Sequence, residues 1–198
     1  EYLKDKPHTP CGALAVFYRI QIDRNEDGIA TAVITDNLLK AWGITKEQLH
    51  KDAVQAENER NPVQFYSMEA MMANLMFSEE PDNLFDRDVT LDLDFTPLYV
   101  LTNPDRLDGA AVIARDGVQE KIAELLGSNY YVLPSSVHEV LIMPDHGNMQ
   151  AKELTDMVRE INATQVAPAD RLSGKVQYYD RQTRQLSCEQ EKSVLGRL

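Results

Sequence analysis

The sequence predicts an α+β fold, in which helices pack on a mainly antiparallel sheet built from strand–turn–strand–helix units. Hydrophobic residues make up 43% of the 198 residues, which is enough to form a core. Strand-like runs come in pairs around turn sequences, and a helical pattern follows each of three such pairs. The three units share no residue-level repeat, so this rhythm is architectural and does not indicate duplication.

The first unit begins with strand patterns at 13–22 and 29–34, which flank the turn sequence DRNEDG. A helix is expected to follow at Thr45, because threonine is a favoured N-cap residue. Ile44 and Leu49 have the spacing of a hydrophobic staple across that helix start. The sequence therefore predicts a hairpin followed by a well-defined helix.

The turn of this first unit also has the spacing of half a calcium loop. The residues that match the first half of an EF-hand are Asp23, Asn25, Asp27 and Gly28. Ile34, however, stands where the bidentate glutamate is required, and the flanking segments are strand-like rather than helical. Since Asp-Gly is a strong hairpin signal, a hairpin turn is the better interpretation.

The second unit has strand patterns at 98–102 and 110–114 around the turn sequence NPDRLDG. Asp116 is expected to cap the helix that follows, and Gly127 is expected to end it. The apolar stripe of that helix consists of Val118, Ile122, Leu125 and Leu126.

The third unit has strand patterns at 130–133 and 137–143, each followed by a proline, which lacks the N–H that a ladder needs. The second strand is apolar on both of its alternating faces, which indicates a central strand or one covered on both sides. A helix at 151–162 and a final hairpin at 175–188 complete the expected elements.

Polar residues gather between the two strands of the third unit. The candidate binding residues are Ser135, Ser136, His138 and Glu139. A catalytic serine needs a base within hydrogen-bond reach, and that base needs an orienting partner. Ser136 and His138 can share one face of an extended chain, whereas Glu139 points away from His138. The alternative is a turn in which the serines bond the local backbone. We therefore assign no catalytic residue.

The charge and composition of the chain exclude several classes of partner. The net charge is −12 and the pI is near 4.7, so the positive footprint that a nucleic-acid binder needs is missing. Anionic membrane surfaces are disfavoured for the same reason, and no apolar run is long enough to span a bilayer. Cys11 and Cys188 match no metal spacing and are expected to be free thiols. We expect no cofactor, no metal and a cytoplasmic location.

Two segments in the middle of the chain suggest a protein-binding surface. Four of the seven methionines lie in a predicted helix at 67–77, namely Met68, Met71, Met72 and Met76. Methionine-rich surfaces accept varied apolar partners, although the same pattern also fits a core helix. At 88–95 apolar residues alternate with mostly acidic ones, which predicts a strand with one acidic face. Such a face is either solvated or able to hold a cation or a basic peptide.

Six segments of the chain carry a family resemblance. They are LAVFYRI (14–20), AWGITKEQL (41–49), LYVLTN (98–103), GAAVI (109–113), YYVLPSSVHEVLIMP (130–144) and VREINATQVAPADRLS (158–173). Together they resemble an uncharacterised bacterial family found mainly in gut anaerobes, and the resemblance covers nearly the whole chain. It implies a bacterial intracellular protein and carries over no activity. Members of that family have further sequence before the position that matches Glu1, so we expect a fragment of a longer protein.

The chain is long enough for a single α+β domain over 1–198 or for two closely packed subdomains, with a candidate hinge near 78–97. We expect a non-catalytic intracellular domain that binds another protein or a peptide. The acidity of the chain and its methionine-rich helix lead to this expectation. The alternative is a hydrolase, metal-assisted or not, with a site around Ser136, His138 and Glu139. The sequence leaves the oligomeric state open.

Overall fold

The computed structural model describes residues 2–25, 28–78, 80–88, 90–91, 98–147, 151–164 and 166–188. The chain divides into two units, Glu1–Arg60 and Asn61–Leu198, and each is described by itself below. All strand pairs between the described residues are antiparallel, and helices accompany them in both units. The predicted α+β class with a mainly antiparallel sheet is therefore confirmed.

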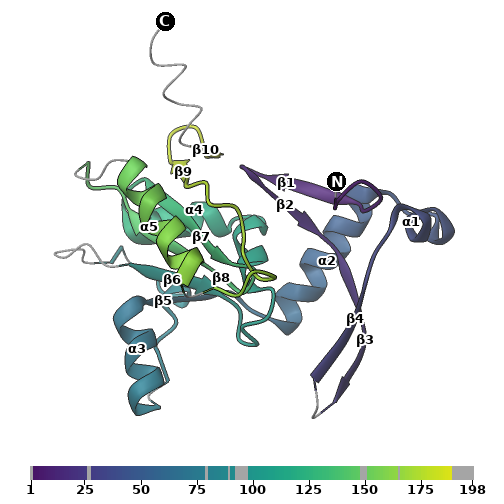
Figure 1. Ribbon diagram of the computed structural model, residues 1–198, viewed down its shortest axis with the longest axis horizontal. Helices are drawn as coiled ribbons and strands as arrows, with labels where there is room; N and C mark the ends of the chain where they lie inside the picture. The colour runs from purple at the N-terminus through teal and green to yellow at the C-terminus, as the bar shows by residue number, and fades with distance from the viewer. Residues whose placement is uncertain are drawn as a thin grey trace, which may run out of the picture. The chain divides into compact units, whose positions relative to one another are not determined.

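The first unit consists of two antiparallel hairpins followed by two helices (Figure 1). Its elements are β1 (His8–Cys11), β2 (Leu14–Phe17), β3 (Arg19–Asn25), β4 (Gly28–Val33), α1 (Asp36–Trp42) and α2 (Lys46–Arg60). The core of this unit is a small buried cluster of Tyr18, Ile34, Leu39 and Leu49. Every residue of β3 is exposed, so that strand adds nothing to the core.

The hydroxyl of Tyr18 links three segments of this small core. It lies 2.5 Å from Thr9 Oγ1 on β1 and 2.8 Å from His50 Nδ1 on α2. Because Tyr18 is buried, these contacts replace the water that its hydroxyl loses on folding. Burial also raises the pKa of Tyr18, which keeps the hydroxyl protonated and able to donate.

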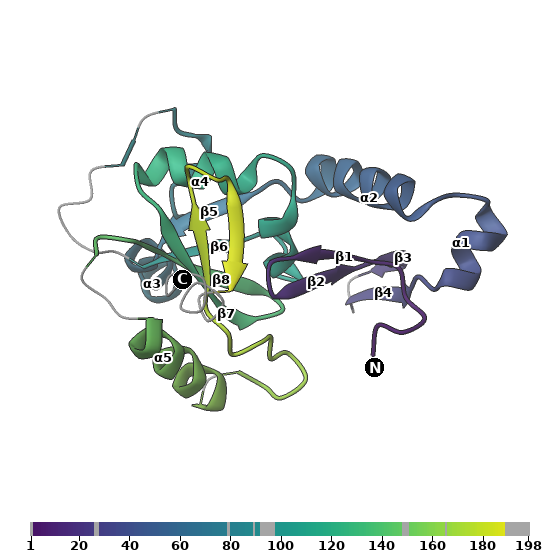
Figure 2. The ribbon, with the colours of Figure 1, turned by 90° about the horizontal axis from the view of Figure 1, so that it is seen from above.

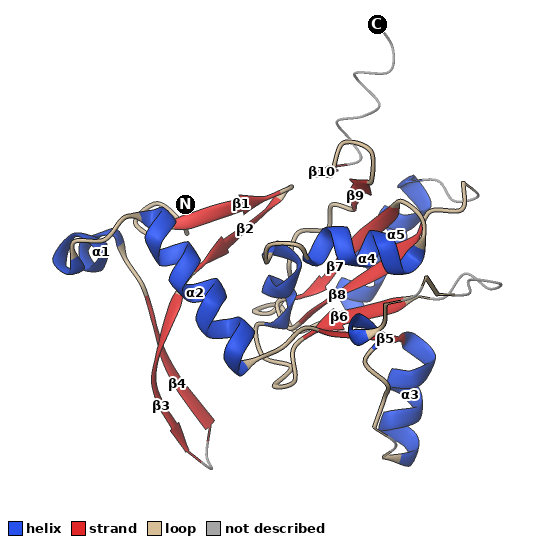
Figure 3. Cartoon of the chain, turned by 180° about the vertical axis from the view of Figure 1, so that it is seen from behind, coloured by secondary structure: helices blue, strands red, loops and turns tan. Residues whose placement is uncertain are grey.

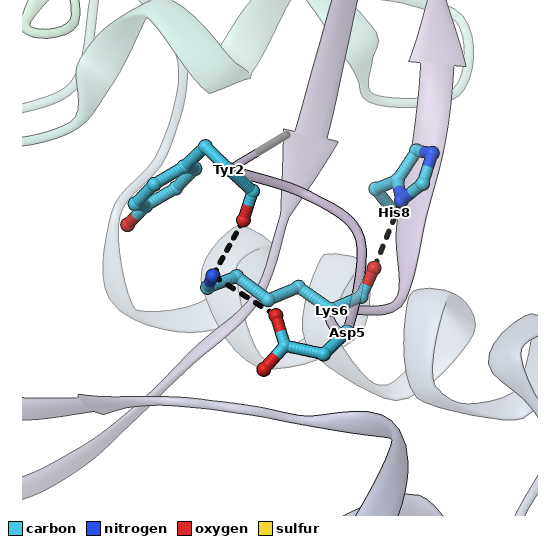
Figure 4. A network of polar contacts seen from close by, with 4 residues as sticks. All are labelled: Tyr2, Asp5, Lys6 and His8. Atoms are coloured by element: carbon cyan, nitrogen blue, oxygen red, sulfur yellow. Dashed lines mark hydrogen bonds and ion pairs between the residues drawn. The ribbon is translucent and has the colours of Figure 1, made fainter.

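The loop before β1 is closed by contacts around Lys6 (Figure 4). Lys6 Nζ donates to the carbonyl of Tyr2 at 2.5 Å and to Asp5 Oδ1 at 3.2 Å, and it lies 4.1 Å from the centre of the Tyr2 ring. His8 Nδ1 is 2.8 Å from the carbonyl of Lys6. These contacts hold the chain in a tight loop where it enters the first hairpin.

The first unit departs from the sequence prediction at 13–22. That segment is two strands, β2 and β3, because β2 pairs with β1 whereas β3 pairs with β4. Helix α1 was not predicted. It begins at Thr35, whose Oγ1 accepts the N–H of Leu38 at 3.4 Å, and it ends at Gly43 with a φ of 68°.

Two predictions in the first unit are confirmed. The N–H of Gln48 donates to Thr45 Oγ1 at 3.1 Å, and Ile44 packs against the cluster that contains Leu49. The predicted hairpin also forms between β3 and β4, whereas Asp27 of its turn lies outside the described residues.

The second unit is built on a six-stranded antiparallel sheet with the order β10-β9-β7-β8-β6-β5 (Figure 3). Its strands are β5 (Gln64–Ser67), β6 (Tyr99–Thr102), β7 (Tyr130–Ser136), β8 (Glu139–Pro144), β9 (Gln177–Asp180) and β10 (Gln185–Cys188). Its α-helices are α3 (Met68–Phe77), α4 (Val118–Leu126) and α5 (Ala151–Thr164), and its 3-10 helices are η1 (Leu84–Asp86) and η2 (Gly109–Ala114).

Helices α4 and α5 cover opposite faces of this sheet (Figure 2). On one face Leu141 and Met143 of β8 belong to a buried cluster with Leu154 and Val158 of α5. On the other face Tyr130 Oη donates to the carbonyl of Gln119 on α4 at 3.1 Å. Strand β8 is buried on both sides in the middle of the sheet, which confirms the prediction from its two apolar faces.

The free edge of the sheet at β5 is covered by a side chain. Asn83 Oδ1 accepts the N–H of Phe65 at 2.9 Å, and Asn83 Nδ2 donates to the carbonyl of Val63 at 2.9 Å. The Asn83 amide therefore bonds the outer edge as a neighbouring strand would, which discourages another strand from pairing there.

The predicted strand at 110–114 is wrong, because this segment is the 3-10 helix η2. Both edges of β6 are already paired, with β5 and with β8, so no edge is left for a hairpin partner. The buried residues of η2 are Gly109, Ala110, Val112 and Ile113, a spacing that fits helical turns better than alternation. The predicted cap at Asp116 is also wrong, since α4 begins after Gly117, with a φ of 77°, and has no side-chain cap.

The remaining predictions in the second unit divide in two groups. Four predictions are confirmed. The strand predicted at 98–102 is β6, and the helix predicted at 151–162 is α5. The final hairpin is formed by β9 and β10, and α4 ends at Gly127. The acidic strand predicted at 88–95 falls mostly at positions 89 and 92–95, which lie outside the described residues. The candidate hinge near 78–97 likewise stays a prediction.

Candidate functional site

The four residues that the sequence singles out lie at the turn between β7 and β8. Ser135 and Ser136 end β7, His138 is in the turn, and Glu139 begins β8. Strand β7 thus runs through Pro134, where its end was predicted, and His138 is outside the strand predicted from 137. At Pro134 β7 pairs with β8 alone, because its pairing with β9 has already ended. A residue without an N–H is tolerated at such a place.

Both serines are buried, and Ser136 stabilises the turn. Ser135 is the extra residue of a β-bulge, because the register steps from Pro134 opposite Val140 to Ser136 opposite Glu139. Ser136 Oγ accepts the backbone N–H of His138 at 3.1 Å. This is the local turn bond that the sequence offered as the alternative to a catalytic serine.

Both ring nitrogens of His138 face groups other than a serine. Nδ1 accepts the backbone N–H of Asp108 at 3.3 Å, and Nε2 lies 3.7 Å from Asp170 Oδ1. A neutral ring whose Nδ1 accepts carries its proton on Nε2, which is the side of the Asp170 carboxylate. In this arrangement His138 is not placed to take a proton from Ser136.

The backbone of the turn is bonded to three distant segments. The carbonyl of His138 accepts Thr102 Oγ1 from the end of β6 at 2.8 Å. Val137 accepts the N–H of Ala110 in η2 at 3.1 Å and donates its own N–H to the carbonyl of Asp170 at 2.8 Å. The turn therefore ties β6, η2 and the loop after α5 to one point of the sheet.

The contacts described for this turn join segments of the fold, and a binding role of its four residues stays a prediction. Glu139 opens β8 opposite Ser136 and is half-buried. Among the described residues, histidine, cysteine and carboxylate side chains form no group of three or more that could hold a metal ion. Sequence reasoning missed Asp108 and Asp170, because they reach His138 from loops far along the chain and no local pattern marks them.

Helix α3 is the second candidate site, and it leaves the sheet at β5 (Figures 1 and 3). Ser67 Oγ accepts the N–H of Ala70 at 3.2 Å and begins the helix. The N–H of Ser78 donates to the carbonyl of Asn74 at 2.8 Å and ends the helix with a φ of 56°. The helix predicted at 67–77 is thus confirmed.

One face of α3 is packed and the other is exposed. Met71 is 7% exposed and belongs to the cluster under α5, with Met68 beside it. The exposed large side chains are Met72 (52%), Leu75 (72%), Met76 (65%) and Phe77 (69%). Met72, Leu75 and Met76 have i, i+3, i+4 spacing, so they form one stripe along the helix. The two interpretations of this helix, core and surface, each describe one of its faces.

The loop after β6 holds α3 in place. Arg106 Nη2 donates to Asn74 Oδ1 at 3.2 Å and lies 3.6 Å from Met71 Sδ. Asn103 closes the loop by donating from Nδ2 to the carbonyl of Leu107 at 2.9 Å and by accepting the N–H of Leu107 at 3.3 Å. Leu107, next to Arg106, is 40% exposed. The helix is therefore bonded to a loop that itself presents an apolar side chain.

Acidic side chains lie near this helix. Glu69 is exposed on α3 itself, and Glu80 and Asp86 are exposed in the segment that follows. Burial raises the pKa of Tyr66 on β5, the charge of Arg106 lowers it, and the charges of Glu80 and Asp86 raise it further. One exposed carboxylate therefore lies on α3, and a second, Glu80, lies two residues after Ser78, which ends the helix.

Comparisons with known proteins place the chain in a family and leave its activity open. No described helix is both long enough and apolar enough to cross a membrane. No curated protein and no solved structure matches the chain. The model of a family of unknown function, DUF5688, matches residues 1–181. This match confirms the resemblance to an uncharacterised family, and the chain belongs to DUF5688.

Proposed function

We propose that the chain is a protein- or peptide-binding domain and that the exposed face of α3 is its docking surface. One observation carries the proposal. Among the described residues of the second unit, large apolar side chains are exposed at five positions, and four of these lie on α3. The fifth, Leu107, is in the loop that Arg106 bonds to α3.

The clustering of these side chains distinguishes them from ordinary exposed apolar residues. Single apolar residues are common on protein surfaces, whereas a contiguous group often marks an interaction site. Full burial of one such side chain contributes roughly 1.5–3 kcal/mol. A stripe of Met72, Leu75 and Met76 could therefore supply most of the affinity of a modest complex. Methionine adds adaptability, since its flexible thioether follows the shape of the partner.

The surface is presented on a fixed support. Met71 is buried in the core cluster, Ser67 caps the helix, and Arg106 bonds Asn74 from outside. A partner would therefore bind a preformed helix and would lose little affinity to ordering it.

The hydrolase alternative gains no support from the turn at His138. Ser136 Oγ accepts a backbone N–H, and the ring of His138 faces Asp108 and Asp170. This alternative stays a prediction. A hydrolytic activity of the purified protein that disappears in a folded His138→Ala variant would revive it.

Site-specific photo-crosslinking in the native cells tests the docking surface. A benzoylphenylalanine replaces Met76 in one variant and Ile22 in the control, because Ile22 is 69% exposed on β3 in the other unit. We expect a discrete adduct with one protein from position 76 and none with that protein from position 22. The same adducts from both positions, or none from position 76, would remove the support for this surface.

A further inference from the structure

We propose that the partner segment docked on α3 is a basic amphipathic helix, with lysine or arginine side chains beside its apolar stripe. The inference rests on the proposed function, because it assumes that α3 is the docking surface. It adds the chemical class of the partner. Three features carry it: the shape of the apolar stripe, the charges at its margins, and the net charge of the whole chain.

The shape of the stripe suits a helix. α3 has ten residues, which corresponds to roughly 15 Å of helix. Met72, Leu75 and Met76 form a ridge on its exposed side, and such ridges pack into the grooves of another helix. A strand would instead need a free sheet edge, and the edge at β5 is already bonded by Asn83.

The margins of the stripe are acidic. Glu69 lies on α3 three positions before Met72, so the two side chains are neighbours on the helix surface. Glu80 is also exposed and follows Ser78, the residue that ends α3, by two positions. In the described part of the chain, no basic side chain forms an ion pair with Glu69 or Glu80.

The nearby cations are already engaged. Arg87, in the segment that follows α3, pairs with Asp82. Arg106 donates to Asn74 from the side of α3 that carries Met71, not from the exposed stripe. Exposed carboxylates therefore lie on α3 and just after its end, and they would favour lysine or arginine on the partner.

The net charge of −12 also favours a basic partner, because electrostatic attraction acts beyond the contact surface. It attracts a basic partner and speeds the encounter, most strongly at low salt. A second copy of the chain would bring the same charge and the same carboxylates to the contact, so self-association through α3 is opposed by repulsion. An anionic membrane surface is opposed for the same reason.

Two synthetic helical peptides test the inference. Both carry the same leucine stripe, and one has lysines and the other glutamates on the remaining positions. We expect the lysine peptide to bind the wild-type chain at least about tenfold more tightly, and its affinity to fall as salt rises. The variant Glu69→Lys/Glu80→Lys should lose at least about tenfold in affinity for it. The matched variant Glu124→Lys/Glu160→Lys changes two exposed carboxylates on α4 and α5 and should bind as the wild type does.

The outcomes separate this inference from the docking surface itself. The variant Met72→Ser/Leu75→Ser/Met76→Ser should bind neither peptide. If both peptides bind the wild type equally and the serine variant binds neither, the docking surface stands and the basic partner is wrong. If the lysine peptide binds the serine variant as tightly as the wild type, the docking surface on α3 is wrong. A wild-type dimer in sedimentation that the serine variant does not form would identify a second copy as the occupant and overturn the inference.

Discussion

Gly109 lies where β6, η2 and the β7–β8 turn meet. A Cβ at this position would be 2.3 Å from Thr102 Oγ1 and 2.4 Å from the carbonyl oxygen of His138, far inside van der Waals contact. The missing side chain therefore lets η2 approach the turn closely, while Thr102 donates to the same carbonyl at 2.8 Å. The need for glycine here comes from close packing and not from an unusual φ.

The variant Gly109→Ala should lower the free energy of unfolding by roughly 3 kcal/mol, because one of the two obstructing atoms is backbone. Urea denaturation measures the change. Gly174→Ala is the matched control, since its Cβ would meet Arg159 Cγ at an ordinary 3.8 Å. Equal urea midpoints for the two variants would contradict this description of the junction.

Cys11 gives a pH-dependent prediction at the same scale. Burial raises the pKa of Cys11 from 9.0 to about 11. Between these two values the unfolded chain loses the thiol proton while the folded chain keeps it, so the stabilising contribution of Cys11 is complete below pH 9 and is lost as pH rises through 11. The difference in unfolding free energy between wild type and Cys11→Val should change by roughly 2 kcal/mol over this window.

The comparison with Cys11→Val isolates the thiol, because the buried tyrosines titrate in both proteins and their contribution cancels. Denaturant titrations at several pH values would give the difference directly. A difference that stays constant across the window would show that the Cys11 thiol is not protected by burial.

At the scale of elements, the two ends of α3 differ in quality. Ser67 is a favourable N-cap that accepts the N–H of Ala70, whereas Ser78 adopts the left-handed conformation with a φ of 56°, which suits glycine better. Ser78→Gly should raise the free energy of unfolding by about 0.5–1 kcal/mol, and Ser67→Ala should lower it by about 1 kcal/mol. Amide exchange of α3 together with urea denaturation checks both, and changes of the same sign would contradict the assignment of the two ends.

The sequence predicts an element well where the periodicity of its apolar residues fits only one type of secondary structure. In β8 the alternating side chains are apolar on both faces, which predicts a strand that is covered on both sides. The structure places β8 in the middle of the sheet, buried on both sides. The segment GAAVI (109–113) is too short for its pattern of apolar residues to distinguish a strand from a helix. It cannot form a hairpin with β6, because β8 already pairs with the edge of β6 that such a hairpin would need. The prediction that the strand ends at Pro134 was wrong, because a proline is tolerated where a strand is paired on one side only.

The candidate sites show the same limit. The i, i+3, i+4 spacing of Met72, Leu75 and Met76 was visible in the sequence, but its exposure was not, because α3 is apolar on most of its surface. Its exposure follows from where the helix lies, at the sheet edge. The partners of His138 could not be predicted either, since Asp108 and Asp170 meet it only through the tertiary fold.

At the scale of the whole molecule, the charge and the docking surface belong together in one proposal. A net charge of −12 opposes self-association of a chain that exposes an apolar stripe, so it helps to keep the stripe available. A partner that is both apolar and basic would satisfy the two features at once. Binding should therefore weaken with salt and should not vanish at high salt, because apolar burial does not depend on ionic strength in that way.

The most direct test of the docking surface is the dissociation constant of the cross-linked partner for wild type and for Met72→Ser/Leu75→Ser/Met76→Ser. We expect the variant to bind at least about 30-fold more weakly, because three apolar side chains leave the contact. Ile22→Ser should bind as the wild type does, and all three proteins should have similar urea midpoints, since these side chains are exposed. An unchanged dissociation constant for the triple variant would contradict the proposal that α3 is the docking surface.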